Sequence, residues 1–204
     1  MSFQLPIFLM WFIVFVLWLN YKLKKYRKKD TSFWDREAQS NTVRKKSIDS
    51  LNYITVSEIS LPFFSTNDKN IRELETRVLE LSKEKIVNLT GYTNTDLKLE
   101  YGPGNLEALS NYDQNFTYLV RTLFNWASAL EELGFRREAI QVLEFGVECN
   151  TDIKAHYILL AKLYIQENTS EKISNLISVA SDLKSLTKAS LIDELMKLQN
   201  SPII

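Results

Sequence analysis

Two stretches decide the fold: residues 123–130 read LFNWASAL, and residues 157–164 read YILLAKLY. They lie 34 positions apart, and the correspondence continues beyond them, with large apolar residues opposite large ones and small residues opposite small ones. The paired positions are Leu123 with Tyr157, Trp126 with Leu160, Ala127 with Ala161, Leu130 with Tyr164, Gly134 with Asn168, Leu143 with Ile177 and Gly146 with Ala180. A fixed period of this length is typical of helical repeat proteins, in which each repeat buries its apolar face against the next.

Helical spacing of apolar residues predicts four helices in this region, at about 115–133, 136–148, 152–166 and 170–183. Gly134 and Asn168 are expected to end helices, because both residues tolerate the left-handed backbone conformation. Alanines at 127, 139, 161 and 180 would let antiparallel helices approach closely. A fifth helix, at about 187–198, would cover the open end of the array.

Residues 157–164 resemble the W-x2-L-G-x2-Y signature of the tetratricopeptide repeat, and residues 134–140, GFRREAI, resemble its turn and second-helix start. The resemblance covers about 70 residues. It implies a short tetratricopeptide-like (TPR-like) α-solenoid of antiparallel helix pairs. Leu123, Arg136 and Thr151 depart from the family pattern, so a helical bundle with a chance 34-residue echo stays open as the alternative.

The N-terminus has a different composition from the rest of the chain. Residues 1–29 hold six bases and no acid, and residues 5–19 hold no charged or strongly polar side chain. As a helix, residues 3–23 would rise about 30 Å, which is the hydrocarbon thickness of a bilayer. We therefore expect an all-α chain that begins with a transmembrane helix over 3–23, with the basic residues 22–29 against anionic lipid headgroups.

Flanking bases stay on the cytoplasmic side, which predicts a single-pass protein of the cell membrane with its N-terminus outside and residues 30–204 in the cytoplasm. A cleaved signal peptide is disfavoured, because no base precedes the apolar run and no small-residue cleavage site follows it. A buried core helix would rarely be so aromatic or end in so many bases.

The sequence predicts four parts: an anchor with its basic flank (1–29), a juxtamembrane linker or strap (30–69), a helical region with a polar loop (70–114), and the repeats with a capping helix (115–204). A separate helix is expected at about 32–46, with Ser32 as its N-cap. The apolar, β-branched segment 53–64 is expected to be extended. It is either a strap laid along the helices or a motif offered to a partner.

Several classes of function are excluded by composition. One cysteine and one histidine cannot form an intrachain disulfide framework or the usual zinc sites, and the one possible dyad is Cys149 with His156. Residues 30–204 carry 19 bases against 25 acids, which disfavours nucleic acid as a partner. The Gly102-Pro103-Gly104 turn lacks the spacing of a nucleotide-binding loop. We expect no catalytic residue, no cofactor, no metal site and no independent enzymatic activity.

The resemblance implies a protein–protein interaction or scaffold module at the inner membrane face, which binds a segment of another, membrane-associated protein in a concave groove. The implied groove positions are Arg121, Phe124, Ser128, Glu131 and Glu132 in the first repeat and Ala155, Ile158, Lys162, Ile165 and Gln166 in the second repeat. One alternative is an accessory subunit of a membrane enzyme or transport complex, with a site in the 88–105 loop around Asp96 and Asn105. Another is a homo-oligomer held together by the anchor and the array.

Overall fold

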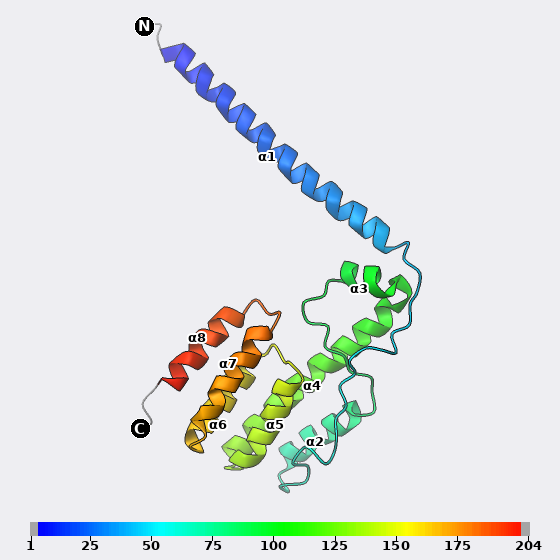
Figure 1. The fold of residues 1–204 in the computed structure, drawn as a ribbon, viewed down its shortest axis with the longest axis vertical. Coiled ribbons are helices and arrows are strands. Elements are labelled where there is room, and N and C mark those ends of the chain that lie inside the picture. Colours follow the sequence, from blue (N-terminus) through cyan, green and yellow to red (C-terminus); the bar gives the residue numbers. More distant parts are fainter. Residues whose placement is uncertain (1–3, 201–204) are drawn as a thin grey trace. The chain divides into compact units, whose positions relative to one another are not determined.

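The computed structural model describes the backbone of residues 4–200 and the side chains of residues 9–25 and 32–200. Within that range the chain is all helical, with 69% helix and no strand. The α-helices are α1 (Gln4–Ser40), α2 (Lys69–Leu81), α3 (Asn94–Tyr101), α4 (Leu106–Glu132), α5 (Arg136–Glu148), α6 (Lys154–Gln166), α7 (Ile173–Asp182) and α8 (Lys188–Gln199), with short 3-10 turns before α4 and α7 (Figure 1).

The chain divides into two compact units, which are described separately. Unit 1 comprises Met1–Ser47 and Thr93–Leu106, and unit 2 comprises Ile48–Tyr92 and Glu107–Ile204. Unit 1 therefore holds α1 and α3, and unit 2 holds the other helices. The four-part division expected from the sequence stays a prediction.

The expected transmembrane anchor is overturned. Among the described residues, no helix carries an apolar stretch long enough to cross a membrane. The described part of the expected span is free of charge from Leu9 to Tyr21, about 20 Å of helix, which is roughly two thirds of a hydrocarbon core. Lys22, Lys24 and Lys25 follow it, and the side chains of residues 3–8 lie outside the described part. The single-pass topology, with residues 30–204 placed in the cytoplasm, falls with the anchor.

The separate linker helix is also wrong, because α1 runs without a break through Ser32 to Ser40. The sequence is consistent with this: no glycine or proline occurs between Pro6 and the end of α1 at Ser40, so no residue of that kind breaks the helix near Ser32. Ser32 is consequently an interior position of α1 and not the N-cap of a separate helix.

Unit 1 is held together where the end of α1 meets α3. Arg36 forms an ion pair with Asp96, and Glu37 forms one with Lys98. The Thr93 hydroxyl accepts the backbone N–H of Asp96, and the Asp96 carboxylate accepts the backbone N–H of Thr93, which makes a capping box for α3. The stretch expected to be an irregular polar loop at 88–105 therefore contains an eight-residue helix.

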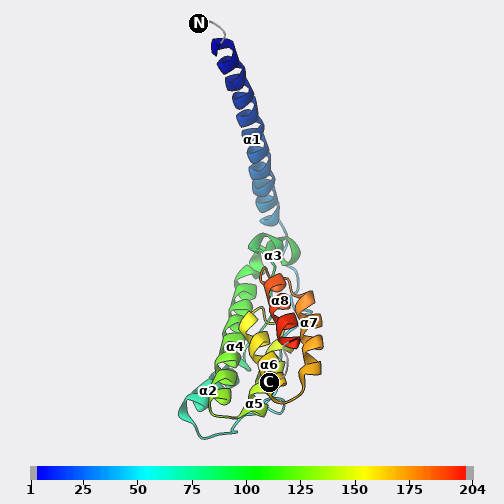
Figure 2. The same ribbon diagram turned by 90° about the vertical axis from the view of Figure 1, so that its left-hand side faces the viewer.

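Unit 2 contains the helical array. Figure 1 shows consecutive helices from α4 to α8 running in alternating directions, and Figure 2 shows α6, α7 and α8 side by side from the perpendicular view. The helix α5 has the expected bounds, and the ends of α6, α7 and α8 lie within three residues of the expected ones. The last helix, α8, packs on both α6 and α7. The alanines at 127, 139, 161 and 180 are all fully buried.

The turns between these helices have the expected backbone. Gly134 has φ 84° and Asn168 has φ 55°, so both adopt the left-handed conformation. After each of them the chain closes the helix in the same way: the Phe135 N–H donates to the Leu130 carbonyl at 2.8 Å, and the Thr169 N–H donates to the Tyr164 carbonyl at 2.8 Å. This pattern is the Schellman motif, which satisfies carbonyls at a helix C-terminus. Membership of the tetratricopeptide family stays a prediction.

The segment expected to be extended at 53–64 is so only in its first part: turns occupy Glu58–Ser60 and Phe63–Phe64, and Phe64 has a left-handed φ of 62°. The segment lies along the helices of unit 2. The Ile54 N–H donates to the Ile86 carbonyl at 2.9 Å, and Val56 and Leu61 are buried in the core. The Phe63 ring lies 5.0 Å from the Trp126 ring. Burial of Val56 and Leu61 gives this segment a structural role in the core of unit 2.

Candidate functional site

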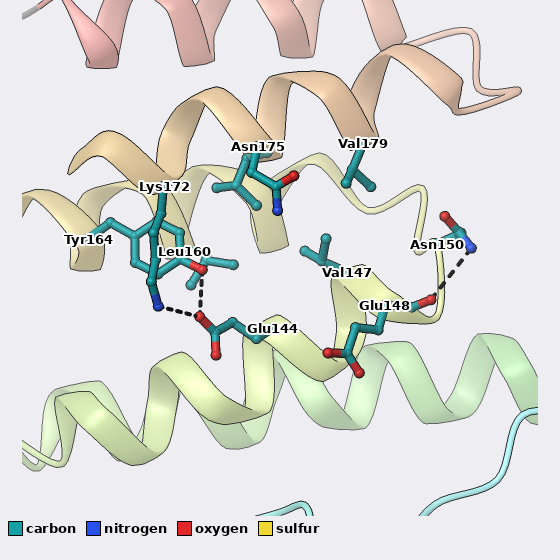
Figure 3. Close-up of a pocket in the computed structure, with 10 residues that line it drawn as sticks. Glu144, Val147, Glu148, Asn150, Leu160, Tyr164, Lys172, Asn175 and Val179 are labelled. Carbon is teal, nitrogen blue, oxygen red and sulfur yellow. Dashed lines mark hydrogen bonds and ion pairs between the residues drawn. The ribbon is translucent and has the colours of Figure 1, made fainter. Parts of the chain in front are cut away.

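A cavity of about 550 Å³ opens between α5, α6 and α7 in unit 2 (Figure 3). Its apolar lining comes from Val147, Leu160, Leu176 and Val179. Its polar lining consists of Glu144, Glu148, Asn150, Tyr164, Lys172 and Asn175. The volume falls within the range of sites that hold small molecules or side chains of a partner, about 300–1,000 Å³.

Helical spacing explains why these side chains converge. On α5, Glu144, Val147 and Glu148 are three and four residues apart, so they share one face of the helix. On α6, Leu160 and Tyr164 are four apart, and both are almost fully buried. Since α5 and α7 both pack on α6, the two α6 side chains form the base and the faces of α5 and α7 form the walls.

One end of the cavity holds a compact polar cluster. The Tyr164 hydroxyl donates to Glu144 Oε1 at 2.7 Å, and Lys172 Nζ donates to the same oxygen at 3.1 Å. Lys172 Nζ also lies 5.1 Å from the centroid of the Tyr164 ring, within cation–π range. Burial raises the pKa of the Tyr164 hydroxyl well above its usual value, and the nearby Glu144 carboxylate raises it further. The hydroxyl therefore stays protonated and acts as a donor.

The other end of the cavity is acidic. Figure 3 shows Glu148 and Asn150 far from Lys172, across the apolar lining. A second cavity of about 470 Å³ shares these two residues and adds Asp152, Asp182 and Lys184 to its lining. Among the described ion pairs, none involves Glu148, Asp152 or Asp182. The two cavities therefore meet at an acidic rim.

Cys149 and His156 do not form a dyad. His156 is fully buried, and its Nε2 lies 2.8 Å from the Val120 carbonyl oxygen. Burial lowers the pKa of the His156 imidazole, although its hydrogen bond to Val120 opposes the shift. Burial, with the charge of Glu148, raises the pKa of the Cys149 thiol to about 12. A protonated thiol is a poor nucleophile and a poor metal ligand.

The predicted groove residues lie elsewhere in unit 2, on α4 and α6. Phe124 packs against the His156 ring at 5.5 Å between centroids, which joins the two helices. Phe124, Ser128, Glu131, Ile158 and Ile165 are half-buried, whereas Arg121, Glu132, Ala155, Lys162 and Gln166 are exposed. None of them lines the cavity between α5, α6 and α7. Their role as a binding groove stays a prediction.

At the end of the array, an acidic residue of α8 is paired with a base of α6. Lys154 on α6 forms an ion pair with Glu194 on α8 at 2.6 Å. Hydrogen bonding to Lys154 lowers the pKa of the Glu194 carboxyl, and the charge of Lys162 lowers it further. An acidic residue of α8 therefore lies near the predicted groove position Lys162.

The polar residues of the 88–105 stretch hold structure together. Asp96 caps α3 and pairs with Arg36. Asn105 is buried, and its side-chain amide donates to the carbonyls of Lys46 and Tyr101, each at 2.7 Å. Within the described residues, no group of His, Cys, Asp and Glu side chains is arranged to hold a metal ion.

The polar cluster of Glu144, Tyr164 and Lys172 was not foreseen from the sequence. Its members come from α5, from α6 and from the 3-10 turn before α7, and Glu144 and Lys172 are 28 positions apart. The repeat alignment includes Tyr164 as a core position, and this was the one available signal. Comparisons with protein-family models, with curated proteins and with solved structures return no match.

Proposed function

We propose that this chain is a protein–protein interaction module, and that the cavity between α5, α6 and α7 receives a side chain of a partner segment. The observation that carries the proposal is the cavity itself, which has an apolar base, polar ends and an opening between two helices. Burying one aliphatic side chain of a partner there would contribute about 1.5–3 kcal/mol. A rim of polar groups would set the orientation of the segment.

A second feature supports an interaction role. Large apolar side chains on α1 are exposed over successive turns, among them Trp11 at 67%, Phe15 at 54% and Trp18 at 53%. Contiguous exposed apolar surface of this kind marks an interaction site, since it is costly to leave in water. The chain therefore offers a partner more than one surface.

The bonds that the polar groups already make support interaction over catalysis. His156 and Cys149 are engaged in the core of unit 2, and Asp96 and Asn105 have structural bonds in unit 1. The accessory-enzyme alternative relied on Asp96 and Asn105 as reactive groups. Those contacts leave it without a specific observation in its favour.

The test is selection of peptides against the full chain. A displayed library of random peptides is first depleted on the Asn175→Trp variant, whose indole would block the exposed mouth of the cavity, and then selected on the unmodified chain. Depletion removes peptides that bind α1 or other surfaces. We expect the surviving peptides to bind the unmodified chain and to lose binding to Asn175→Trp.

The matched control is Ser178→Trp, an exposed position on the same helix that does not line the cavity. Its binding should equal that of the unmodified chain, and circular dichroism should show equal helicity for both variants. Peptides that are instead lost with Phe124→Ala or Ile158→Ala would move the site to the predicted groove. If no peptide distinguishes Asn175→Trp from Ser178→Trp, the cavity is not the site.

A further inference from the structure

The two units carry opposite charge. Unit 1 holds 11 bases and 5 acids, a net of +6, whereas unit 2 holds 14 bases and 20 acids, a net of −6. The cavity thus belongs to an acidic body. Long-range attraction by such a body favours association with cationic partners and disfavours anionic ones.

The local charges at the cavity have the same sign. Among the described residues, Lys172 is the one base that lines it, and that base is already bonded to Glu144 and lies over the Tyr164 ring. Glu148 at the opposite end has no partner among the described ion pairs. The adjoining cavity is lined by two acids, Asp152 and Asp182, and one base, Lys184. A partner that covers the opening therefore meets Glu148, a carboxylate in no described ion pair, beside an apolar base.

From this arrangement we infer that the recognised partner segment is basic, with an aliphatic side chain that enters the cavity and a lysine or arginine beside it that pairs with Glu148. The inference rests on the proposed function, because it names the chemistry of the segment that the same cavity binds. The aliphatic group lies against Val147, Leu160 and Val179. The cation lies at the exposed rim, where it contributes selectivity and a salt-dependent rate of association.

Lys172 acts as an internal competitor for a partner's cation. Its ammonium is half exposed and occupies one oxygen of Glu144, whose side chain is 36% exposed. Removing the Lys172 charge leaves Glu144 available to the incoming base. Lys172→Met should therefore strengthen binding of a basic segment, whereas loss of a carboxylate at the rim should weaken it.

The experiment uses the peptides that survive the selection described above. Most should carry a lysine or arginine next to an aliphatic residue. Glu148→Gln should weaken their binding by about two- to fivefold at low salt, as expected for an exposed ion pair. Glu138→Gln, which removes one acid from the same helix outside the cavity, is the matched control and should leave binding unchanged. Lys172→Met should strengthen binding by a similar factor, and all these differences should shrink as salt is raised.

The outcomes separate the two ideas. Absence of any peptide that depends on the cavity rejects the proposed function. Peptides that depend on the cavity but are neutral or acidic, or that bind Glu148→Gln as well as the unmodified chain, reject the basic segment and leave the interaction module standing. Self-association of the chain that is blocked by Asn175→Trp would replace the basic segment with a second copy as the occupant.

Discussion

Gly146 on α5 should not tolerate even a methyl group. A Cβ atom added there would lie 2.6 Å from both Cε1 and Nδ1 of His156. Ordinary contacts are at least 3.4 Å, so the ring would have to retreat by about 0.8 Å. It has little freedom to do so, because Nε2 is bonded to the Val120 carbonyl and the Phe124 ring contacts the imidazole. Gly146→Ala therefore forces the rigid ring out of its site.

The magnitude follows from three opposing effects. Overpacking of a core costs about 1–3 kcal/mol, and a stretched buried hydrogen bond adds up to about 1 kcal/mol. The higher helix propensity of alanine offsets about 1 kcal/mol. The expected net loss is about 2 kcal/mol of unfolding free energy, which corresponds to a decrease in Tm of about 4–8 °C for a chain of this size.

Denaturant unfolding of Gly146→Ala, His156→Ala and the double variant measures this directly. In the double variant the clash is absent, so the losses should be less than additive, with a coupling energy of about 1–2 kcal/mol. The steric reasoning is refuted if Gly146→Ala is as stable as the unmodified chain. Additive losses in the double variant would place the cost somewhere other than the His156 ring.

Three further predictions concern buried polar groups. Folding lowers the pKa of His156, so as the pH falls the unfolded chain binds a proton at this residue before the folded chain does. The free energy of unfolding should therefore be constant above pH 6.5 and fall below it by at most about 1.4 kcal/mol per pH unit. Urea titrations of His156→Gln should lack that slope. Burial raises the pKa of Glu75 above 4.5, so its ionised form destabilises the fold at neutral pH. Glu75→Gln should therefore unfold at the same or a higher urea concentration than the unmodified chain. Glu75→Ala leaves the Phe64 N–H without its acceptor and should lose about 1 kcal/mol of unfolding free energy, so equal stability of the two variants would contradict this reasoning. Asn105→Ala leaves the Lys46 carbonyl unpaired in unit 1, so amide hydrogen exchange should accelerate in α3 and stay unchanged in α6; uniform acceleration would argue against a local role.

Local patterns were sufficient to place most helices of unit 2. The spacing of apolar residues, with Gly134 and Asn168 as stop signals, predicted α5 with its observed bounds and the turns at φ 84° and 55°. The reason is that helix periodicity and left-handed turn residues are encoded by residues close together in the chain. The same approach failed at Thr93, where a capping box begins a helix inside a stretch read as a loop.

The N-terminal prediction failed for a different reason. Hydropathy led to a span over 3–23, but charged residues begin at Lys22 and no described helix is long and apolar enough to cross a membrane. Continuity of α1 past Ser32 also overrode the expected linker helix. Composition measures how apolar a stretch is, whereas helix length depends on where the helical backbone ends, and α1 continues without a break to Ser40.

By itself the sequence determined the helical class of this protein, the order of its repeat-region helices, the approximate bounds of α5 to α8, and the alanines at which they approach; α4 begins at Leu106, well before the expected start near 115. Tertiary structure alone decided where a cavity forms, and it placed that cavity on α5, α6 and α7; the groove expected on α4 and α6 stays a prediction. Glu144, Tyr164 and Lys172 meet there because three helices pack in one register, and no pattern along the chain records that register. Helix formation depends on neighbours within a turn or two, whereas a site depends on the distances between helices, which side-chain packing sets.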